Sequence, residues 1–312
     1  MEGGRGDGSG RELDLWNQFL EKELLGLQKN NRLRILDSKR HSLIDFASND
    51  YLSLNTSGRL RSILKDVLVN YDGPIGSTGS RLICGHYDSF ETAESDFARF
   101  TGHESALLFH SGYAANTGVL QALFSPGDTV FCDRLAHASL LDGIRLSGAN
   151  RRYFLHNDLE DLDKRLAAHN TKKSKAAGRT RSWIVTESIF SMDGDTIKLG
   201  HYADIAEKYG ALLLLDEAHA VGITGPGGAG LAAASGIQKR IAVTVYPMGK
   251  APGLMGAFVC GSATLKQYLI NRARSFIFST AQPPFMGTLL SRVIALLPSQ
   301  EMEDARSRIR QN

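Results

Sequence analysis

Short apolar runs alternate with helical patterns after residue 100, and this alternation constrains the fold more than any other feature. The runs that have the length and residue types of buried strands are 106–110, 129–133, 151–155, 183–187, 211–217, 241–246 and 256–262. Helical patterns such as 158–169 and 201–210 lie between them. Buried strands that alternate with helices predict an α/β fold with a mostly parallel central sheet covered by helices.

Composition and charge exclude several classes of protein. The 312 residues include 36 Lys and Arg against 33 Asp and Glu, without a basic stripe interleaved with aromatics, so we expect no nucleic-acid partner. Three cysteines lie far apart without a CxxC pair, so we expect neither a disulfide framework nor a metal site. No apolar run reaches the roughly 18 residues of a membrane span, and no signal region begins the chain. We therefore expect a cytoplasmic protein with no membrane partner.

The remaining segments suggest a division into domains. Residues 1–10 are rich in glycine, which predicts a disordered tail. Apolar residues at helical spacing over 11–36 predict an amphipathic helix, and we place an N-terminal helix and arm at 11–50. We expect a large domain at 51–285 and the start of a further domain at 286–312. The polar stretch 170–182 predicts a surface loop inside the large domain.

Polar side chains follow several predicted strands. Asp133, Glu187 and Asp216 each end a strand, and His137 and His219 follow two of them closely. In open parallel sheets, ligands bind outside the carboxyl ends of the strands. This placement predicts a functional site there.

Lys250 and Asp216 have the surroundings that Schiff-base chemistry requires. Lys250 lies in MGKAPG, where small neighbours let a bulky planar cofactor approach the backbone and partial desolvation frees the amine. Asp216 ends an apolar strand in DEAHAVG, and a buried carboxylate needs a cationic partner such as a protonated pyridine nitrogen. Taken singly, each residue also fits a simpler role, as a surface lysine or a turn-capping aspartate.

Three further motifs contain turn residues. The turn HSGYAAN contains Gly112 and Tyr113, and free N–H groups at a helix start there would suit a phosphate; a plain strand–helix connection is the simpler alternative. The motif TESIFSMDGD places Ser191 after a strand. The segment GPGGAG at 225–230 satisfies G-x-G-x-x-G, but it contains a proline and does not directly join a strand to a helix, so we expect a flexible loop.

Several segments together resemble the α-oxoamine synthase family of fold-type I pyridoxal-phosphate enzymes over about residues 30–290. In chain order these segments are SNDYLSL, GSTGSRLICGHY, ALLFHSGYAANTGVL, DRLAHASLLDGIRLSGA, TESIFSMDGD, DEAHAVG, MGKAPGLMGAFVCGS and FIFSTAQPP. The resemblance implies a fold-type I large domain and an acyltransferase that uses pyridoxal 5'-phosphate. That family continues into a smaller C-terminal domain, which we expect to be largely absent because the sequence stops at Asn312.

The resemblance also implies roles for single residues. Lys250 would hold the cofactor as a Schiff base and exchange the substrate's α-proton. Asp216 would pair with the pyridine nitrogen, His219 would bind the ring's phenolate oxygen, and His137 would stack on the ring. The other cofactor contacts would be made by Gly112, Tyr113 and Ser191. Asn49 would lie near the entrance, and the GSTGSR loop at 76–81 would reach the phosphate of a partner subunit in a homodimer.

The implied reaction is a decarboxylating condensation of L-alanine with a pimeloyl thioester, carried by CoA or an acyl carrier protein, as in biotin biosynthesis. One departure from the family concerns Pro247, which stands where a Thr or Ser hydroxyl usually binds the phosphate. Two alternatives therefore stay open. The chain could be a truncated, catalytically impaired paralogue that still binds the cofactor, or a sibling acyltransferase that uses glycine.

Overall fold

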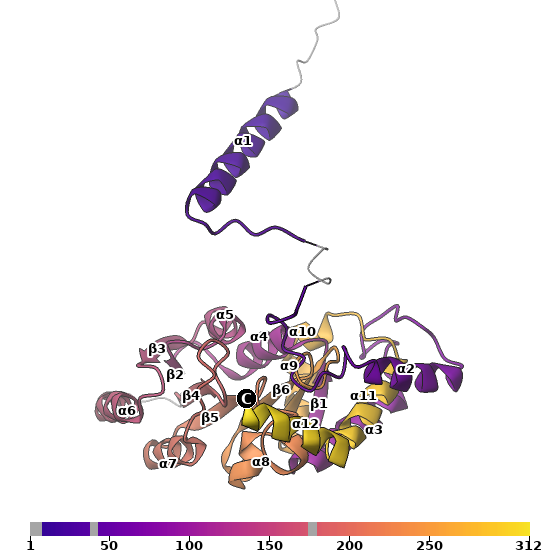
Figure 1. Cartoon of the computed structure of the whole chain (residues 1–312). Coiled ribbons are helices and arrows are strands. Elements are labelled where there is room, and N and C mark those ends of the chain that lie inside the picture. The colour runs from indigo at the N-terminus through magenta and orange to yellow at the C-terminus, as the bar shows by residue number, and fades with distance from the viewer. Residues whose placement is uncertain (1–7, 38–42, 174–179) are drawn as a thin grey trace, which may run out of the picture. The chain divides into compact units, whose positions relative to one another are not determined.

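A computed structural model describes residues 8–37, 43–173 and 180–312 (Figure 1). Its strands are β1 (Ser105–Phe109), β2 (Thr129–Asp133), β3 (Asn150–Phe154), β4 (Ser182–Glu187), β5 (Leu212–Asp216), β6 (Val243–Pro247) and β7 (Ala257–Gly261). Its α-helices are α1 (Gly8–Lys29), α2 (Arg59–Val69), α3 (Asp88–Thr101), α4 (Gly112–Leu123), α5 (Ala138–Ser147), α6 (Leu159–Lys173), α7 (Leu199–Tyr209), α8 (Leu231–Ser235), α9 (Ala263–Arg272), α10 (Arg274–Ile277), α11 (Phe285–Leu296) and α12 (Gln300–Gln311).

The strands form one sheet in the order β1-β7-β6-β5-β4-β2-β3. Strand β7 runs antiparallel to both of its neighbours, and all other pairs are parallel. The prediction of a mostly parallel sheet is confirmed, and each predicted run overlaps one strand. Because six strands run the same way, the ends of β1, β2, β4, β5 and β6 meet at one edge, which we call the carboxyl edge.

Helices cover both faces of the sheet, as the sequence predicts (Figure 1). On one face, alternate strand residues such as Leu107 and Val185 pack against α4, α5, α9 and α10. On the other face, Ile184 and Leu213 pack against α6, α7 and α8. The burial alternates along each strand because successive side chains point to opposite faces.

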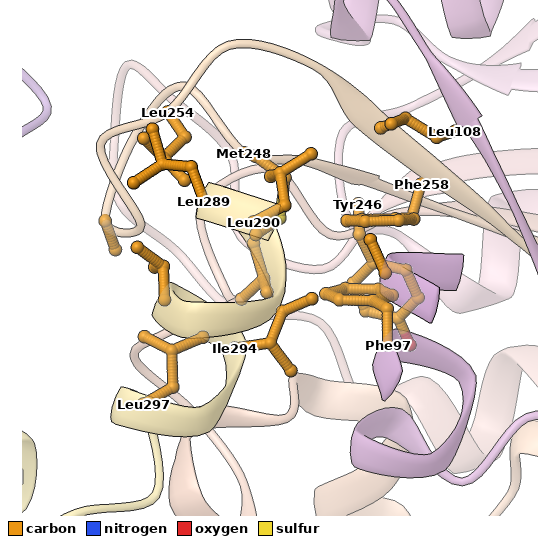
Figure 2. Packing of buried hydrophobic residues seen from close by; sticks show 14 of the residues in the cluster. Phe97, Leu108, Tyr246, Met248, Leu254, Phe258, Leu289, Leu290, Ile294 and Leu297 are labelled. Carbon is orange, nitrogen blue, oxygen red and sulfur yellow. The ribbon is translucent and has the colours of Figure 1, made fainter. Parts of the chain in front are cut away.

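The C-terminal helices belong to this core. Leu290 and Ile294 of α11 are buried together with Phe97 of α3 and Phe258 of β7 (Figure 2). The rings of Phe97 and Phe258 stack with centroids 4.2 Å apart. The chain divides into the compact units Met1–Ala47 and Ser48–Asn312, so 286–312 lies in the same unit as the predicted large domain. An apolar face of α11 is buried on α3. The start of a further domain at 286 stays a prediction.

Helix α12 is tied to the loop that follows β5. The Arg306 side chain is 1% exposed, and its Nη1 donates to the carbonyl oxygens of Leu297 at 2.9 Å and of Gly222 and Gly227 at 3.4 Å. These carbonyl groups and Glu303 compensate the burial of the guanidinium.

The N-terminal unit contains the predicted amphipathic helix, with shifted ends. Helix α1 begins at Gly8, inside the predicted tail, and ends at Lys29 because Asn31 has a left-handed φ of 54°, which asparagine tolerates better than most residues. Residues 1–7 lie outside the described residues. The predicted loop at 170–182 also begins later, because α6 continues to Lys173, and residues 174–179 of it are not described.

Among the helices described, none combines the length and apolar character that a membrane crossing requires.

Of the three cysteines, Cys132 and Cys260 are buried in the sheet and Cys84 is exposed. Burial raises the pKa of the Cys132 and Cys260 thiols far above the usual value.

Candidate active site

A cavity of about 370 Å³ opens at the carboxyl edge of the sheet. Of the residues singled out from the sequence, those that line it are Asn49, Gly112, Tyr113, His137, Glu187, Asp216, His219, Pro247 and Lys250. A larger hollow of about 940 Å³ lies at the opposite edge, where β4 and β6 begin, beside Trp183, Lys239 and Tyr268. This hollow is lined by none of the predicted site residues Glu187, Asp216, His137, His219 and Lys250, so we place the chemistry in the smaller cavity.

Two buried carboxyl groups stand side by side on the cavity floor. Glu187 and Asp216 are register partners at the ends of the parallel strands β4 and β5. Asp216 accepts hydrogen bonds from Asn116 Nδ2 at 2.7 Å and from the Ala218 N–H at 2.9 Å. Glu187 Oε1 accepts one from the His137 N–H at 2.6 Å. Burial, and secondly the charge of Asp216, raises the pKa of Glu187 to about 8. Two carboxyl groups this close therefore hold one negative charge more readily than two.

Lys250 lies in a tight turn that follows β6. The Leu254 N–H donates to Met248 O at 2.8 Å, and the Gly253 N–H donates to Lys250 O at 2.8 Å. Gly253 has a φ of 71°, which favours glycine at this position. Burial lowers the pKa of the Lys250 amine, whereas the charges of Asp216 and Glu187 oppose that shift. A lowered pKa increases the fraction of free amine, the form that reacts with a carbonyl.

His219 is held by Tyr51. The Tyr51 hydroxyl lies 2.8 Å from His219 Nδ1 and also 2.8 Å from Asn49 Oδ1. Burial lowers the pKa of His219 to about 4, and the charge of Lys250 contributes to this shift. The ring is therefore neutral at physiological pH, and its Nε2 remains for a hydrogen bond to a ligand.

His137 caps the first turn of α5. Its side chain accepts a hydrogen bond from the Ser139 N–H at 3.2 Å, and its Nδ1 lies 2.8 Å from Ser139 Oγ. The residue is exposed and lines the cavity. Helix α5 comes close to α4 at Gly143, where an added Cβ would lie 2.6 Å from the Leu120 side chain. This close approach places the start of α5 beside α4.

The turn before α4 forms a polar end of the cavity. Ser111 Oγ accepts the Ala114 N–H at 3.1 Å. Within the described residues, the N–H groups of Gly112 and Tyr113 have no partner, as at other helix starts, and they can bind an anion. An added Cβ at Gly112 would lie 2.7 Å from the Pro247 ring, so only glycine lets the two segments meet. The Tyr113 hydroxyl donates to Asp142 Oδ2 at 2.5 Å.

Ser191 does not join the other predicted residues. It is exposed in the turn after β4 and does not line the cavity, so its role as a cofactor contact stays a prediction. The GPGGAG segment contains the 3₁₀ turn Pro226–Gly228 and does not directly join a strand to a helix; the flexibility expected of this loop stays a prediction.

Sequence reasoning missed two residues that connect the site. Asn116 and Ser139 line the cavity and bind each other, with Asn116 Nδ2 2.9 Å from Ser139 Oγ. Asn116 lies four residues after Gly112, hence on the same side of α4, and this spacing was a signal that could have been used. Contact between α4 and α5 has no such signal in the sequence.

Comparisons with known proteins agree with this geometry. The family model described as aminotransferase class I and II matches residues 41–312. The chain is similar to the 8-amino-7-oxononanoate synthases of Citrifermentans bemidjiense and Marinobacter nauticus, at 40% and 38% identity. These matches cover 89% and 94% of the chain and 68% and 73% of the two relatives.

Solved structures give the same result. The 8-amino-7-oxononanoate synthase of Francisella tularensis superposes with a TM-score of 0.71 at 32% identity, over 87% of this chain and 73% of that one. A serine palmitoyltransferase of S. paucimobilis with bound PLP–myriocin aldimine gives 0.72 at 29% identity, over 81% of this chain. The chain spans only 61% of that structure's length.

Proposed function

Because the chain belongs to the aminotransferase class I and II family, we propose that its carboxyl-edge cavity binds pyridoxal 5'-phosphate and that Lys250 is the lysine to which the cofactor is attached. The observation that carries the proposal is the convergence of Lys250, Asp216 and the start of α4 on one cavity. The fold-type I architecture and the resemblance inferred from the sequence are confirmed by the relatives.

The residues present fit the cofactor. Asp216 is 3% exposed and, among the described residues, is bound by amide and backbone donors without an ion pair, so a protonated pyridine nitrogen would supply the missing cation. The N–H groups of Gly112 and Tyr113 would receive the phosphate at the positive end of α4. The exposed ring of His137 leaves room for stacking on a flat ring.

When bound, the cofactor supplies an electron sink for a carbanion next to the amino group of the substrate. The chain's own residues orient the reactants and move protons. Asp216 would hold a proton on the pyridine nitrogen, and His219 would form a hydrogen bond with the cofactor through Nε2. The Lys250 amine, with its lowered pKa, would take a proton from the substrate's α-carbon and return it.

The substrates we propose are L-alanine and a pimeloyl thioester of CoA or an acyl carrier protein, with 8-amino-7-oxononanoate and carbon dioxide as products. Support comes from the names of relatives at 38–40% identity. The protein would then act in biotin biosynthesis, and we expect it in the cytoplasm. A sibling reaction with glycine is tested by comparing α-proton exchange on the two amino acids: faster exchange on glycine would contradict the choice of alanine.

Pro247 favours a second candidate, a catalytically impaired protein that still binds the cofactor. Its ring fills the space beside Gly112 and offers no hydroxyl, so one charge-assisted hydrogen bond to a phosphate is missing. The loss should weaken cofactor binding by about 1.5–3 kcal/mol. Cofactor binding without any aminoketone formed from alanine and pimeloyl-CoA would favour this candidate.

A homodimer is the assembly we propose. The GSTGSR loop at 76–81 would reach the partner's cofactor phosphate, and it is flanked by exposed Ile75, Leu82 and Ile83. Such apolar side chains are typical of an interface. Light scattering should give twice the chain's mass of 34.0 kDa, and Ile83→Asp should shift the mass toward one chain. A wild-type monomer with full cofactor binding would contradict the shared site.

The direct test of the cofactor proposal is absorbance. Purified protein with added pyridoxal phosphate should gain a band in the visible range, because the lysine-bound cofactor absorbs there. Lys250→Ala should abolish the band, whereas the matched change Lys65→Ala, at an exposed site on α2, should leave it unchanged. A band that survives in Lys250→Ala would move the attachment site elsewhere.

A further inference from the structure

The hydrogen bonds around His137 specify which ring nitrogen carries the proton. The Ser139 backbone N–H can only donate, and it points at His137 Nδ1 from 3.2 Å. Nδ1 must therefore be an acceptor. Among the described residues Nε2 has no partner, and His137 lines the cavity. The geometry thus leaves Nε2 as the nitrogen available to a ligand.

Asn116 determines the direction of the next hydrogen bond. Its Nδ2 group has two hydrogens, and they go to Ser139 Oγ at 2.9 Å and to Asp216 Oδ2 at 2.7 Å. A flipped amide would turn Oδ1 toward the Asp216 carboxylate, oxygen against oxygen. Because Ser139 Oγ accepts from Asn116, its own hydrogen is free to be donated to His137 Nδ1, 2.8 Å away.

One observation suggests that the amide orientation serves the site. Asn116 is 2% exposed, and its Oδ1 has no hydrogen-bond partner among the described residues. A buried acceptor without a partner is unfavourable. Both amide hydrogens are nevertheless bound, one by Asp216 and one by Ser139. The amide is therefore oriented for its two donated hydrogen bonds rather than for its acceptor.

We propose that Ser139 and Asn116 are positioning residues that fix the His137 proton on Nε2 and join this ring to Asp216 in one hydrogen-bonded chain. This inference rests on the proposed function for its consequence, that an N–H donor faces the substrate. The chain runs from Asp216 to Asn116, Ser139 and His137, and each step is a direct contact. The His137 backbone is held separately by Glu187, the neighbour of Asp216.

Substitutions at the two positions should have different consequences. Ser139→Ala removes a donor to His137 and leaves both hydrogen bonds to Asp216, so turnover should fall about tenfold with cofactor affinity unchanged. Asn116→Ala removes a donor to Asp216 as well, so both turnover and cofactor affinity should fall. Ser139→Thr keeps the hydroxyl and should recover part of the turnover.

The closing experiment reads the proton directly. Nitrogen NMR of the full chain, labelled in its nine histidines and free of cofactor, should show His137 with the proton on Nε2; His137→Gln identifies its signals. Ser139→Ala should shift the Nδ1 resonance. Ser147→Ala is the matched control in the same helix, because its hydroxyl donates to Ile144 O at 2.7 Å and accepts the Ala149 N–H at 3.2 Å, both away from His137.

Two outcomes would overturn the proposal: a wild-type ring with its proton on Nδ1, or a His137 Nδ1 resonance that is the same in Ser139→Ala as in wild type. Both measurements are made on the chain free of cofactor. A negative result would therefore refute the positioning role of Ser139 and Asn116 without bearing on the proposed function, which the visible band tests.

Discussion

Two groups of buried carboxylates in the Ser48–Asn312 unit are built in opposite ways. Glu94 on α3 is closed: its Oε1 accepts from Arg81 at 2.5 Å and from the Leu108 N–H at 2.9 Å, and its Oε2 accepts from Lys266 at 2.7 Å. Asp216 and Glu187 have neutral donors and face a cavity. The two cationic partners of Glu94 indicate that it stabilises the fold. The absence of such a partner, within the described part of the chain, at Asp216 and Glu187, beside a cavity, indicates a site for a cationic group of a ligand.

Glu94→Ala should have the largest effect and would break the closed cluster. Removing one partner leaves the Arg81 guanidinium, 7% exposed, without its carboxylate, which should lower the free energy of unfolding by about 3–5 kcal/mol. Urea denaturation measures this. Glu91→Ala, one turn earlier on α3 and exposed, is the control and should change little. Equal effects at the two positions would refute the structural role of Glu94.

Asp216→Asn should show that the Asp216–Glu187 pair, unlike Glu94, acts in cofactor binding rather than in folding. Asparagine keeps an oxygen for the Ala218 N–H, and Asn116 can turn its Oδ1, which has no partner within the described residues, toward the new amide group. The unfolding free energy without cofactor should therefore change by less than about 1 kcal/mol. Cofactor affinity should fall by roughly tenfold or more because the charge opposite the pyridine nitrogen is lost. Titration followed by the visible band measures this.

The control for Asp216→Asn is its neighbour. Glu217→Gln changes a carboxylate that faces α8 and accepts the Leu231 and Ala232 N–H groups at 2.9 and 2.7 Å. It should leave cofactor affinity unchanged. Equal loss of affinity in both variants would show that the band reports folding rather than the pairing of Asp216.

Glu187 should make the stability of the folded chain depend on pH. Its pKa is about 8 in the folded chain against 4.5 for an ordinary glutamate, so proton binding favours the folded state. That stabilisation is complete below about pH 4.5 and is lost as the pH rises through 8, with a slope of at most about 1.4 kcal/mol per pH unit. Glu187→Gln should remove this slope from urea denaturation between pH 5 and 8.5.

Glu160→Gln, at an exposed ion pair on α6, should keep the wild-type slope. If Glu187→Gln also kept the wild-type slope, the pH dependence of the unfolding free energy would not come from the burial of Glu187.

These two groups also show what the sequence could predict. The strand pattern located Asp216 and His137 because residues that end parallel strands share an edge, whatever the intervening distance along the chain. The Glu94 cluster joins α3, a loop and α9, and nothing in local spacing connects Arg81 with Lys266. Asn116 and Ser139 depend in the same way on how α4 lies against α5.

Two other predictions depend on information that local sequence does not hold. The 286–312 boundary was placed by resemblance, whereas the burial of α11 on α3 depends on packing between segments far apart in the chain. Asp216 is the last residue of its strand, whereas Ser191 comes four residues after β4, in a turn closed by the bridge between Ile189 and Thr196, and it is exposed. Position after a strand is therefore informative for the first residues only.

The cysteines make the chain ready for site-specific labelling. Cys132 and Cys260 are buried, and their raised pKa values keep them as unreactive thiols, so a maleimide dye should modify Cys84 alone. Cys84 follows the GSTGSR loop, and its Sγ lies against Gly79. A fluorophore there would report, in real time and without mutagenesis, whether this loop meets a second chain when pyridoxal phosphate is added.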